Sequence, residues 1–121
     1  MKRDFDLIRT ILKEIEATPT GKFINQMECE GFDPDVVSAH LVLLEEAGLI
    51  EAAVLKMSSG HSRVKVSKLT WEGHDFLDAI KDDTLWAKAK KNVIGPAGGI
   101  AFSVLLEWAK AEGKSRLGLP P

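Results

Sequence analysis

The chain has 121 residues, of which 45% are apolar and 28% are charged, and its formal net charge is −2. This length suffices for one domain with a real core, and the composition is typical of a soluble globular protein. The longest apolar runs are too short to span a membrane, and the N-terminal MKRDFDLIRTILKEIE lacks the uninterrupted apolar core of a signal peptide. Cys29 is the only cysteine, which excludes an internal disulfide, so we expect a cytoplasmic protein with no membrane partner.

Charge is distributed unevenly along the chain. Residues 1–50 hold five basic and ten acidic residues, whereas residues 51–70 hold four basic residues and one acidic residue. Residues 71–121 hold seven of each sign. The net charge argues against a protein that binds polyanions with its whole surface, but a local basic patch at 51–70 can still attract phosphates.

The N-terminal part predicts a helix followed by a short strand. Apolar residues at three- and four-residue spacings predict an amphipathic helix over about residues 4–17, and the TPTG sequence that follows ends it. A weak alternation of apolar residues then predicts a short strand over 23–29.

A second helix is predicted over residues 33–47. Asp33 is a good N-cap, and Pro34 suits the first helical position, where its missing N–H has no partner to lose. Gly48 supplies a left-handed end to the helix. The ridge expected to be buried consists of Val37, Leu41 and Leu44.

Residues 51–69 predict a two-stranded hairpin. Strand-like runs at 51–56 and 63–69 flank the glycine-containing tip MSSGHS. Thr70 can then cap a helix over 71–81, and Thr84 can cap the next helix. We expect the tryptophans at the start of these two helices, Trp71 and Trp86, to cover the core.

The C-terminal part predicts one more amphipathic helix. The GPAGG sequence at 95–99 ends the preceding helix, and the last helix is expected from about Ile100 to Gly113, before a frayed tail. Three of its residues either form a homodimer or partner contact or pack inside the chain: Val104, Leu105 and Trp108.

The predicted fold class is α+β and mostly helical. The order helix, short strand, helix, two-stranded wing, helix predicts a winged-helix-like domain over residues 1–94. Residues 95–121 then form extra C-terminal helical structure and a tail, either packed on that domain or used for oligomerisation.

No motif predicts catalysis, a metal or a cofactor. Cys29, His40, His61 and His74 stand 11, 21 and 13 residues apart, whereas zinc ligands come at short paired spacings. Acidic neighbours reduce the nucleophilicity expected of the cysteine, and no serine lies in a nucleophile-elbow pattern. The GPAGG glycines lack the Gly-Lys-Ser/Thr of a phosphate loop. We therefore expect a protein that is not an enzyme.

Two surfaces are candidates for nucleic-acid binding, and the helix is the weaker one. Its expected recognition surface consists of Asp35, Ser38, Val42 and Glu45. Helices that read the major groove present Arg, Lys, Asn or Gln instead, and acidic side chains repel the phosphate backbone. His40 lies nearer the buried ridge, where we expect a packed, hydrogen-bonded imidazole.

The wing is the stronger candidate. Its basic residues are Lys56, His61, Arg63, Lys65 and Lys68. Three or four phosphate contacts would give a modest, salt-sensitive affinity. The alternative is a solvated hairpin whose charges keep an exposed edge strand from aggregating.

Three segments together resemble domain of unknown function 2513 over roughly residues 1–110: MKRDFDLIRTILKEIE, EGFDPDVVSAHLVLLEEAGLIEA and LTWEGHDFLDAIKDDTLWAKAKK. The resemblance implies a winged-helix-like fold, an association with phages and prophages, and no established activity or catalytic residues. The helix and hairpin are also similar to the second half of winged-helix transcription regulators. Those proteins carry another helix just before the recognition helix, and the stretch 19–32 is too interrupted by proline and glycine to supply it.

The leading hypothesis is therefore a phage- or prophage-type accessory or regulatory protein that binds nucleic acid, such as double-stranded DNA, through its basic wing. The alternative is a protein-interaction adaptor that keeps the winged-helix scaffold and does not bind DNA. A homodimer is compatible with either hypothesis.

Overall fold

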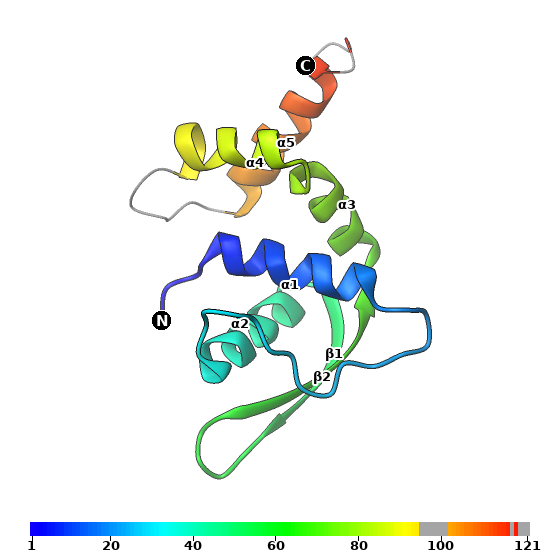
Figure 1. The fold of residues 1–121 in the computed structure, drawn as a ribbon, viewed down its shortest axis with the longest axis vertical. Coiled ribbons are helices and arrows are strands. Elements are labelled where there is room, and N and C mark those ends of the chain that lie inside the picture. Colours follow the sequence, from blue (N-terminus) through cyan, green and yellow to red (C-terminus); the bar gives the residue numbers. More distant parts are fainter. Residues whose placement is uncertain (95–101, 117, 119–121) are drawn as a thin grey trace.

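Helices lie on both sides of a central N-terminal helix, and a β-hairpin extends from one side (Figure 1). The computed structural model describes residues 1–94, 102–116 and 118. Its elements are α1 (Phe5–Ala17), α2 (Pro34–Glu46), β1 (Ile50–Lys56), β2 (Ser62–Leu69), α3 (Trp71–Ile80), α4 (Asp83–Ala89), the π-helical segment η1 (Lys90–Ile94) and α5 (Phe102–Arg116). The predicted α+β, mostly helical class is confirmed, and the order of elements is compatible with a winged-helix-like arrangement.

Helix α1 forms the centre of the fold. The Asp4 carboxylate accepts a hydrogen bond from the Leu7 amide at 3.1 Å and so caps the first turn. The apolar ridge of this helix is buried: Phe5, Leu7, Ile8, Ile11, Leu12 and Ile15. In Figure 1, α1 lies between α2 and the hairpin on one side and α3 on the other, and it contacts all three. The helix predicted at 4–17 is confirmed.

Helix α2 begins and ends where its sequence predicts. The Asp33 carboxylate accepts a hydrogen bond from the Asp35 amide at 2.8 Å, and Pro34 occupies the first turn. Gly48 adopts a positive φ of 75°, which a residue with a side chain rarely adopts. The Leu49 amide donates to the Leu44 carbonyl at 3.0 Å, and this closes the helix and directs the chain into β1.

The hairpin pairs β1 with β2 in antiparallel register, with Val54 opposite Val64. The register shifts between Glu51 and Ala52, and this leaves Ser67 of β2 without a paired residue. Burial alternates along this part of β2, so Val64 and Val66 face the core while Lys65 between them is exposed. The predicted two-stranded hairpin is confirmed.

The strand predicted at 23–29 is reduced to a single bridge. Ile24 and Val66 exchange two backbone hydrogen bonds of 3.0 and 2.9 Å, which holds this segment beside β2. Met27 and Cys29 then turn into the core, because the segment bends inward instead of continuing the ladder. No helix forms between α1 and α2, in agreement with the prolines and glycines of this part of the described chain.

Helix α3 starts at a tight junction with the end of α2. The Thr70 hydroxyl accepts from the Gly73 amide at 3.1 Å and donates to the Gly48 carbonyl at 2.5 Å, and the Thr70 amide donates to the Leu49 carbonyl at 3.0 Å. The predicted Thr70 cap is therefore confirmed. Gly73 is buried in direct contact with the Leu49 backbone, so the junction has no room for a side chain there.

The predicted cap of the next helix is wrong by two residues. Asp82, not Thr84, caps α4, because its carboxylate accepts from the Leu85 amide at 2.8 Å. Thr84 lies exposed inside the helix. Aspartate is among the best N-cap residues, and its position one residue before the first helical residue takes precedence over that of the threonine.

The two tryptophans expected to cover the core differ in their burial. Trp86 is buried as predicted, but Trp71 is 80% exposed, because the first residue of α3 points away from the core that Phe76 and Leu77 fill.

Helix α5 continues to Arg116, three residues beyond the predicted end. The GPAGG sequence lies outside the described residues. None of the described helices is long and apolar enough to cross a membrane.

Candidate nucleic-acid interface

The outer face of the hairpin carries two adjacent cations. Arg63 and Lys65 alternate with the buried Val64 and Val66, so both side chains project from the solvent-facing side of β2. Both line one open depression of about 610 Å³. We call its lining the outer wing face: Asn25, Gln26, Ala53, Val54, Leu55, Arg63 and Lys65. Among the described residues no acidic side chain lines it.

Phe23 lies at the edge of the outer wing face. Its ring is 53% exposed, and the Lys65 ammonium lies 4.4 Å from the ring centroid, within the range of a cation–π contact. The bridge between Ile24 and Val66 explains this proximity, because it aligns the residue before Ile24 with β2. An aromatic ring, a cation and two side-chain amides therefore share one surface.

The other three wing residues, His61, Lys68 and Lys56, differ in their partners. His61 lies 3.0 Å from an Asp35 oxygen, which joins the tip of the hairpin to the start of α2. Lys68 lies 4.0 Å from a Glu51 oxygen on the facing strand. Lys56 is exposed and has no side-chain ion pair within the described part of the chain. The predicted group of five is thus brought onto one hairpin, but only Arg63 and Lys65 line the same depression.

The candidate recognition surface of α2 is acidic and partly covered. Asp35 and Glu45 are exposed, whereas Ser38 and Val42 are half-buried, and Val42 packs against the core. A shallow cleft of about 270 Å³ between α2 and the hairpin includes Asp35, Ser38 and Arg63 in its lining. An acidic helix next to this cleft would repel a phosphate backbone, so the helix does not offer the surface that major-groove docking needs.

His40 serves the core, as predicted. It is fully buried, and its Nε2 accepts a hydrogen bond from the Asp4 amide at 2.9 Å. The other ring nitrogen, Nδ1, therefore carries the proton and donates to the Val36 carbonyl at 2.8 Å. The imidazole joins the N-terminus of α1 to α2 and is not available to a ligand.

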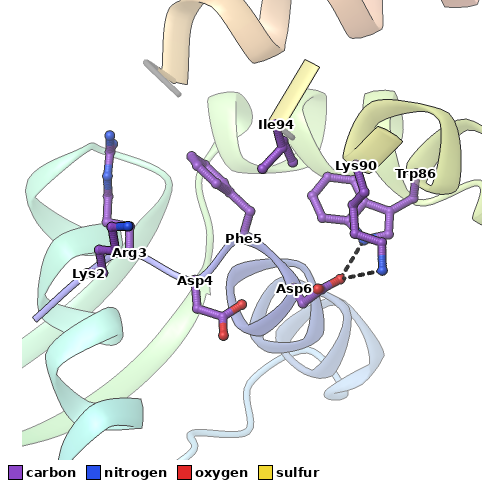
Figure 2. Close-up of a pocket in the computed structure, with 8 residues that line it drawn as sticks. All are labelled: Lys2, Arg3, Asp4, Phe5, Asp6, Trp86, Lys90 and Ile94. Atoms are coloured by element: carbon purple, nitrogen blue, oxygen red, sulfur yellow. Dashed lines mark hydrogen bonds and ion pairs between the residues drawn. The ribbon is translucent and has the colours of Figure 1, made fainter. Parts of the chain in front are cut away.

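A third concavity, of about 330 Å³, lies between the start of α1 and the α4–η1 segment (Figure 2). In Figure 2 the side chains of Trp86 and Lys90 converge on the Asp6 carboxylate, at the opposite end of the pocket from Lys2 and Arg3. The Asp6 oxygen accepts from Trp86 Nε1 at 2.8 Å and lies 3.3 Å from Lys90 Nζ. Because Lys90 balances the charge of Asp6, we assign this cluster a structural role in holding α4 against α1.

Arg9 joins α1 to the turn between α3 and α4. Its guanidinium donates to the carbonyls of Ile80 and Lys81 at 3.1 and 2.8 Å, and to the Asp83 carboxylate at 2.6 Å. The hydrogen bond and the charge of Arg9 lower the pKa of the Asp83 carboxyl below its usual value.

The candidate partner surface on α5 is divided by its packing. Leu105 is fully buried and Trp108 is half-buried against the core, whereas Val104 is 52% exposed. Helix α5 contacts α3 and α4. Of the three residues, only Val104 therefore presents most of its apolar surface to solvent.

Cys29 lies in the core, where burial, and secondarily the charge of Glu14, raises the pKa of its thiol. A protonated, buried thiol is a poor nucleophile. Within the described residues no three His, Cys, Asp or Glu side chains come close enough to hold a metal ion.

The sequence does not reveal the contribution of the segment before α2. It predicts Phe23 only as a strand residue, and it predicts no role for Asn25 and Gln26. A large aromatic residue followed by amides in an otherwise interrupted loop was the available signal. The role of these residues depends on the pairing of their segment with β2, which the sequence alone does not predict.

These features define a small α+β protein with a basic outer face on its hairpin, and its order of elements is compatible with a winged-helix-like arrangement. A family model described as "Hypothetical protein (DUF2513)" matches residues 2–99, so the chain belongs to this family and the resemblance seen in the sequence is confirmed. The chain is 40% identical over 95 residues to an uncharacterized protein of Haemophilus influenzae, and the alignment covers 77% of this chain and 79% of that protein. No solved structure matches the chain at a significant level.

Proposed function

We propose that this protein is a non-enzymatic, cytoplasmic accessory or regulatory protein of phage or prophage type that binds nucleic acid through its wing. The observation that carries the proposal is the position of Arg63 and Lys65. Both are exposed, both line one depression, and neither has an acidic partner among the described residues. Cations that are not neutralised by a carboxylate are suited to contacting phosphates.

The charges elsewhere on the surface support the wing as the contact. Asp35 and Glu45 give α2 a negative surface next to the hairpin, so a polyanion is repelled from the helix. The outer wing face has no such charge in its lining. Binding is therefore expected to orient the hairpin, rather than α2, toward the phosphates.

The salt dependence of binding tests this proposal. Each phosphate contact contributes about 0.9 to the slope of log affinity against log salt for a duplex and about 0.7 for a single strand. Arg63→Ala/Lys65→Ala should lower affinity at low salt by about ten- to a hundredfold and reduce the slope by about 1.4 to 1.8. The matched control is Lys110→Ala/Lys114→Ala, which removes two exposed charges from α5. Equal losses in the two double variants would show that only net charge matters and would refute the wing interface.

A protein-interaction adaptor is the second candidate function. It is favoured by the 80% exposure of Trp71 and by the 62% exposure of Leu55, together with the acidic surface of α2. An adaptor of this kind would not bind nucleic acid. Absence of measurable binding to any nucleic acid at low salt would therefore favour it over the leading proposal.

A further inference from the structure

We infer that the ligand of the outer wing face is an unpaired strand of nucleic acid, and that Phe23 stacks on one of its bases. This inference rests on the proposed function and names the substrate class of the same site. Its central observation is a half-exposed aromatic ring beside cations and amides on one face of the hairpin. Proteins that bind single strands combine a basic groove with aromatic rings on which bases stack.

Phe23 lies where two depressions adjoin. It lines a depression of about 400 Å³ that also includes Ser67 and Lys68, while Lys65, over its ring, lines the outer wing face. A strand that follows β2 would therefore pass from Arg63 and Lys65, across the ring, toward Lys68. Because the backbone of a single strand is flexible, one ring and a row of cations can contact successive nucleotides of the strand.

Two carboxylates along this path, Glu16 and Glu51, have cationic partners, and Asp35, which shares a cleft with Arg63, lies 3.0 Å from His61 Nδ1. Glu16, which lines the depression of about 400 Å³, lies 3.3 Å from Lys81 Nζ and 3.9 Å from His74 Nδ1. Glu51 lies 4.0 Å from Lys68 Nζ. Phosphates along the path therefore meet Arg63 and Lys65 without an unpaired carboxylate in the lining of the outer wing face.

An unpaired strand fits this surface better than a duplex for two reasons. The faces of bases inside a duplex are covered by neighbouring base pairs, so a ring such as Phe23 can stack only on a base that has left the stack. In addition, duplex docking of a winged-helix protein brings the helix next to the wing toward the DNA, and that helix here presents Asp35 and Glu45. The amides of Asn25 and Gln26 can hydrogen-bond to exposed base edges.

Lys65 allows the ring to exchange partners. Its ammonium covers part of the ring in the free protein, and its side chain is exposed and flexible. When a base stacks on Phe23, the ammonium can move to an adjacent phosphate. The cation–π contact thus keeps an exposed aromatic ring partly covered until a strand binds.

The test compares 20-nucleotide probes of one mixed sequence: single-stranded DNA, single-stranded RNA, the DNA duplex, and a strand with abasic sites in place of bases. Fluorescence anisotropy gives the dissociation constant of the full chain for each probe. We expect at least one of the two base-bearing single strands to bind about tenfold or more tightly than the duplex. Phe23→Ala should weaken that binding by about tenfold, and Phe23→Trp should restore it.

Two controls separate stacking from other effects. Trp71→Ala removes an exposed aromatic residue that lines neither depression, and it should leave affinity within about twofold of wild type. The abasic strand keeps the phosphates and lacks the bases, so Phe23→Ala should change its affinity little. Circular dichroism shows whether each variant is folded.

The outcomes distinguish this inference from the proposal beneath it. A duplex bound as tightly as either single strand, with binding still lost in Arg63→Ala/Lys65→Ala, would overturn the single-strand inference and leave the proposed function intact. Equal effects of Phe23→Ala on the base-bearing and abasic strands would overturn the stacking role. Failure of every probe to bind at low salt would overturn both.

Discussion

Substitution of Gly73 by alanine tests how tightly α3 is joined to the turn after α2. A Cβ atom at this position would lie 1.9 Å from the Leu49 carbonyl oxygen and 3.0 Å from its carbon. Ordinary contact begins at 3.4 Å, so the backbone would have to move by about 1.5 Å. The neighbouring atoms are backbone and cannot rotate away, so α3 must shift as a unit.

The expected loss follows from three opposing effects. Alanine is favoured over glycine in a helix by about 1 kcal/mol. Overpacking against backbone costs about 3 kcal/mol, the upper end of the usual range. A shift of α3 also breaks the hydrogen bond from the Gly73 amide to Thr70 Oγ1, 3.1 Å long, which costs about 1 kcal/mol more. We therefore expect Gly73→Ala to lower the free energy of unfolding by about 3 kcal/mol.

Urea denaturation followed by circular dichroism and by tryptophan fluorescence, to which the buried Trp86 contributes, measures this loss. Gly48→Ala is the matched control, since its added Cβ meets no atom within 4 Å but its φ of 75° is unfavourable for alanine. That variant should lose only about 1 kcal/mol. A Gly73→Ala protein as stable as the wild type, or more stable, would refute the close packing of α3 on Leu49.

Three further predictions concern stability and reactivity. His40→Leu should lower the free energy of unfolding by about 2 kcal/mol, because the Asp4 amide loses its acceptor; an unchanged urea midpoint would contradict that hydrogen bond. Leu105→Ala should lower it by about 3 kcal/mol, because Leu105 is fully buried, and a neutral effect would mean that α5 does not pack on the rest of the chain. Burial raises the pKa of the Cys29 thiol, so a thiol reagent should modify the folded protein much more slowly than the urea-unfolded one at weakly alkaline pH; equal rates would refute this.

The Arg9–Asp83 pair adds a pH dependence whose sign is determined by the lowered pKa of Asp83. A carboxyl whose pKa is lower in the folded state stabilises the fold above its unfolded pKa, and this stabilisation is lost as pH falls through the folded pKa. Asp83→Asn should therefore lower the urea midpoint at neutral pH and have no effect at strongly acidic pH. A difference that persisted unchanged into strong acid would contradict the ion pair.

Local chemistry predicted those elements whose ends are marked by single residues. Asp33 and Pro34 start α2, Gly48 ends it, and Thr70 starts α3, each through contacts within a few residues or at the adjoining turn. These capping contacts join residues that are close together in the sequence, so local patterns are enough to predict them. The same local patterns predict Thr84 instead of Asp82 as the N-cap of α4. Both residues are good caps, and the sequence does not show where the preceding helix ends.

Long-range contacts account for what the sequence could not predict. The exposure of Trp71 depends on the rotation of α3 about its own axis where it packs against α1 and the Leu49 carbonyl. No local sequence pattern predicts this rotation. The contact of Phe23 with Lys65 requires the Ile24 bridge to β2, 42 residues later in the chain. The basic composition of the wing was therefore readable from the sequence, whereas the aromatic and amide residues beside it were not.

Comparison of the wing variant with the α5 variant shows whether Arg63 and Lys65 form a nucleic-acid-binding surface. At low salt, the affinities of fluorescent 20-nucleotide single-stranded and duplex probes are measured for the wild type, Arg63→Ala/Lys65→Ala and Lys110→Ala/Lys114→Ala. We predict that the wing variant binds about ten- to a hundredfold more weakly while the α5 variant stays within about threefold of wild type. No binding by the wild type, or equal affinities for the two double variants, would contradict the account.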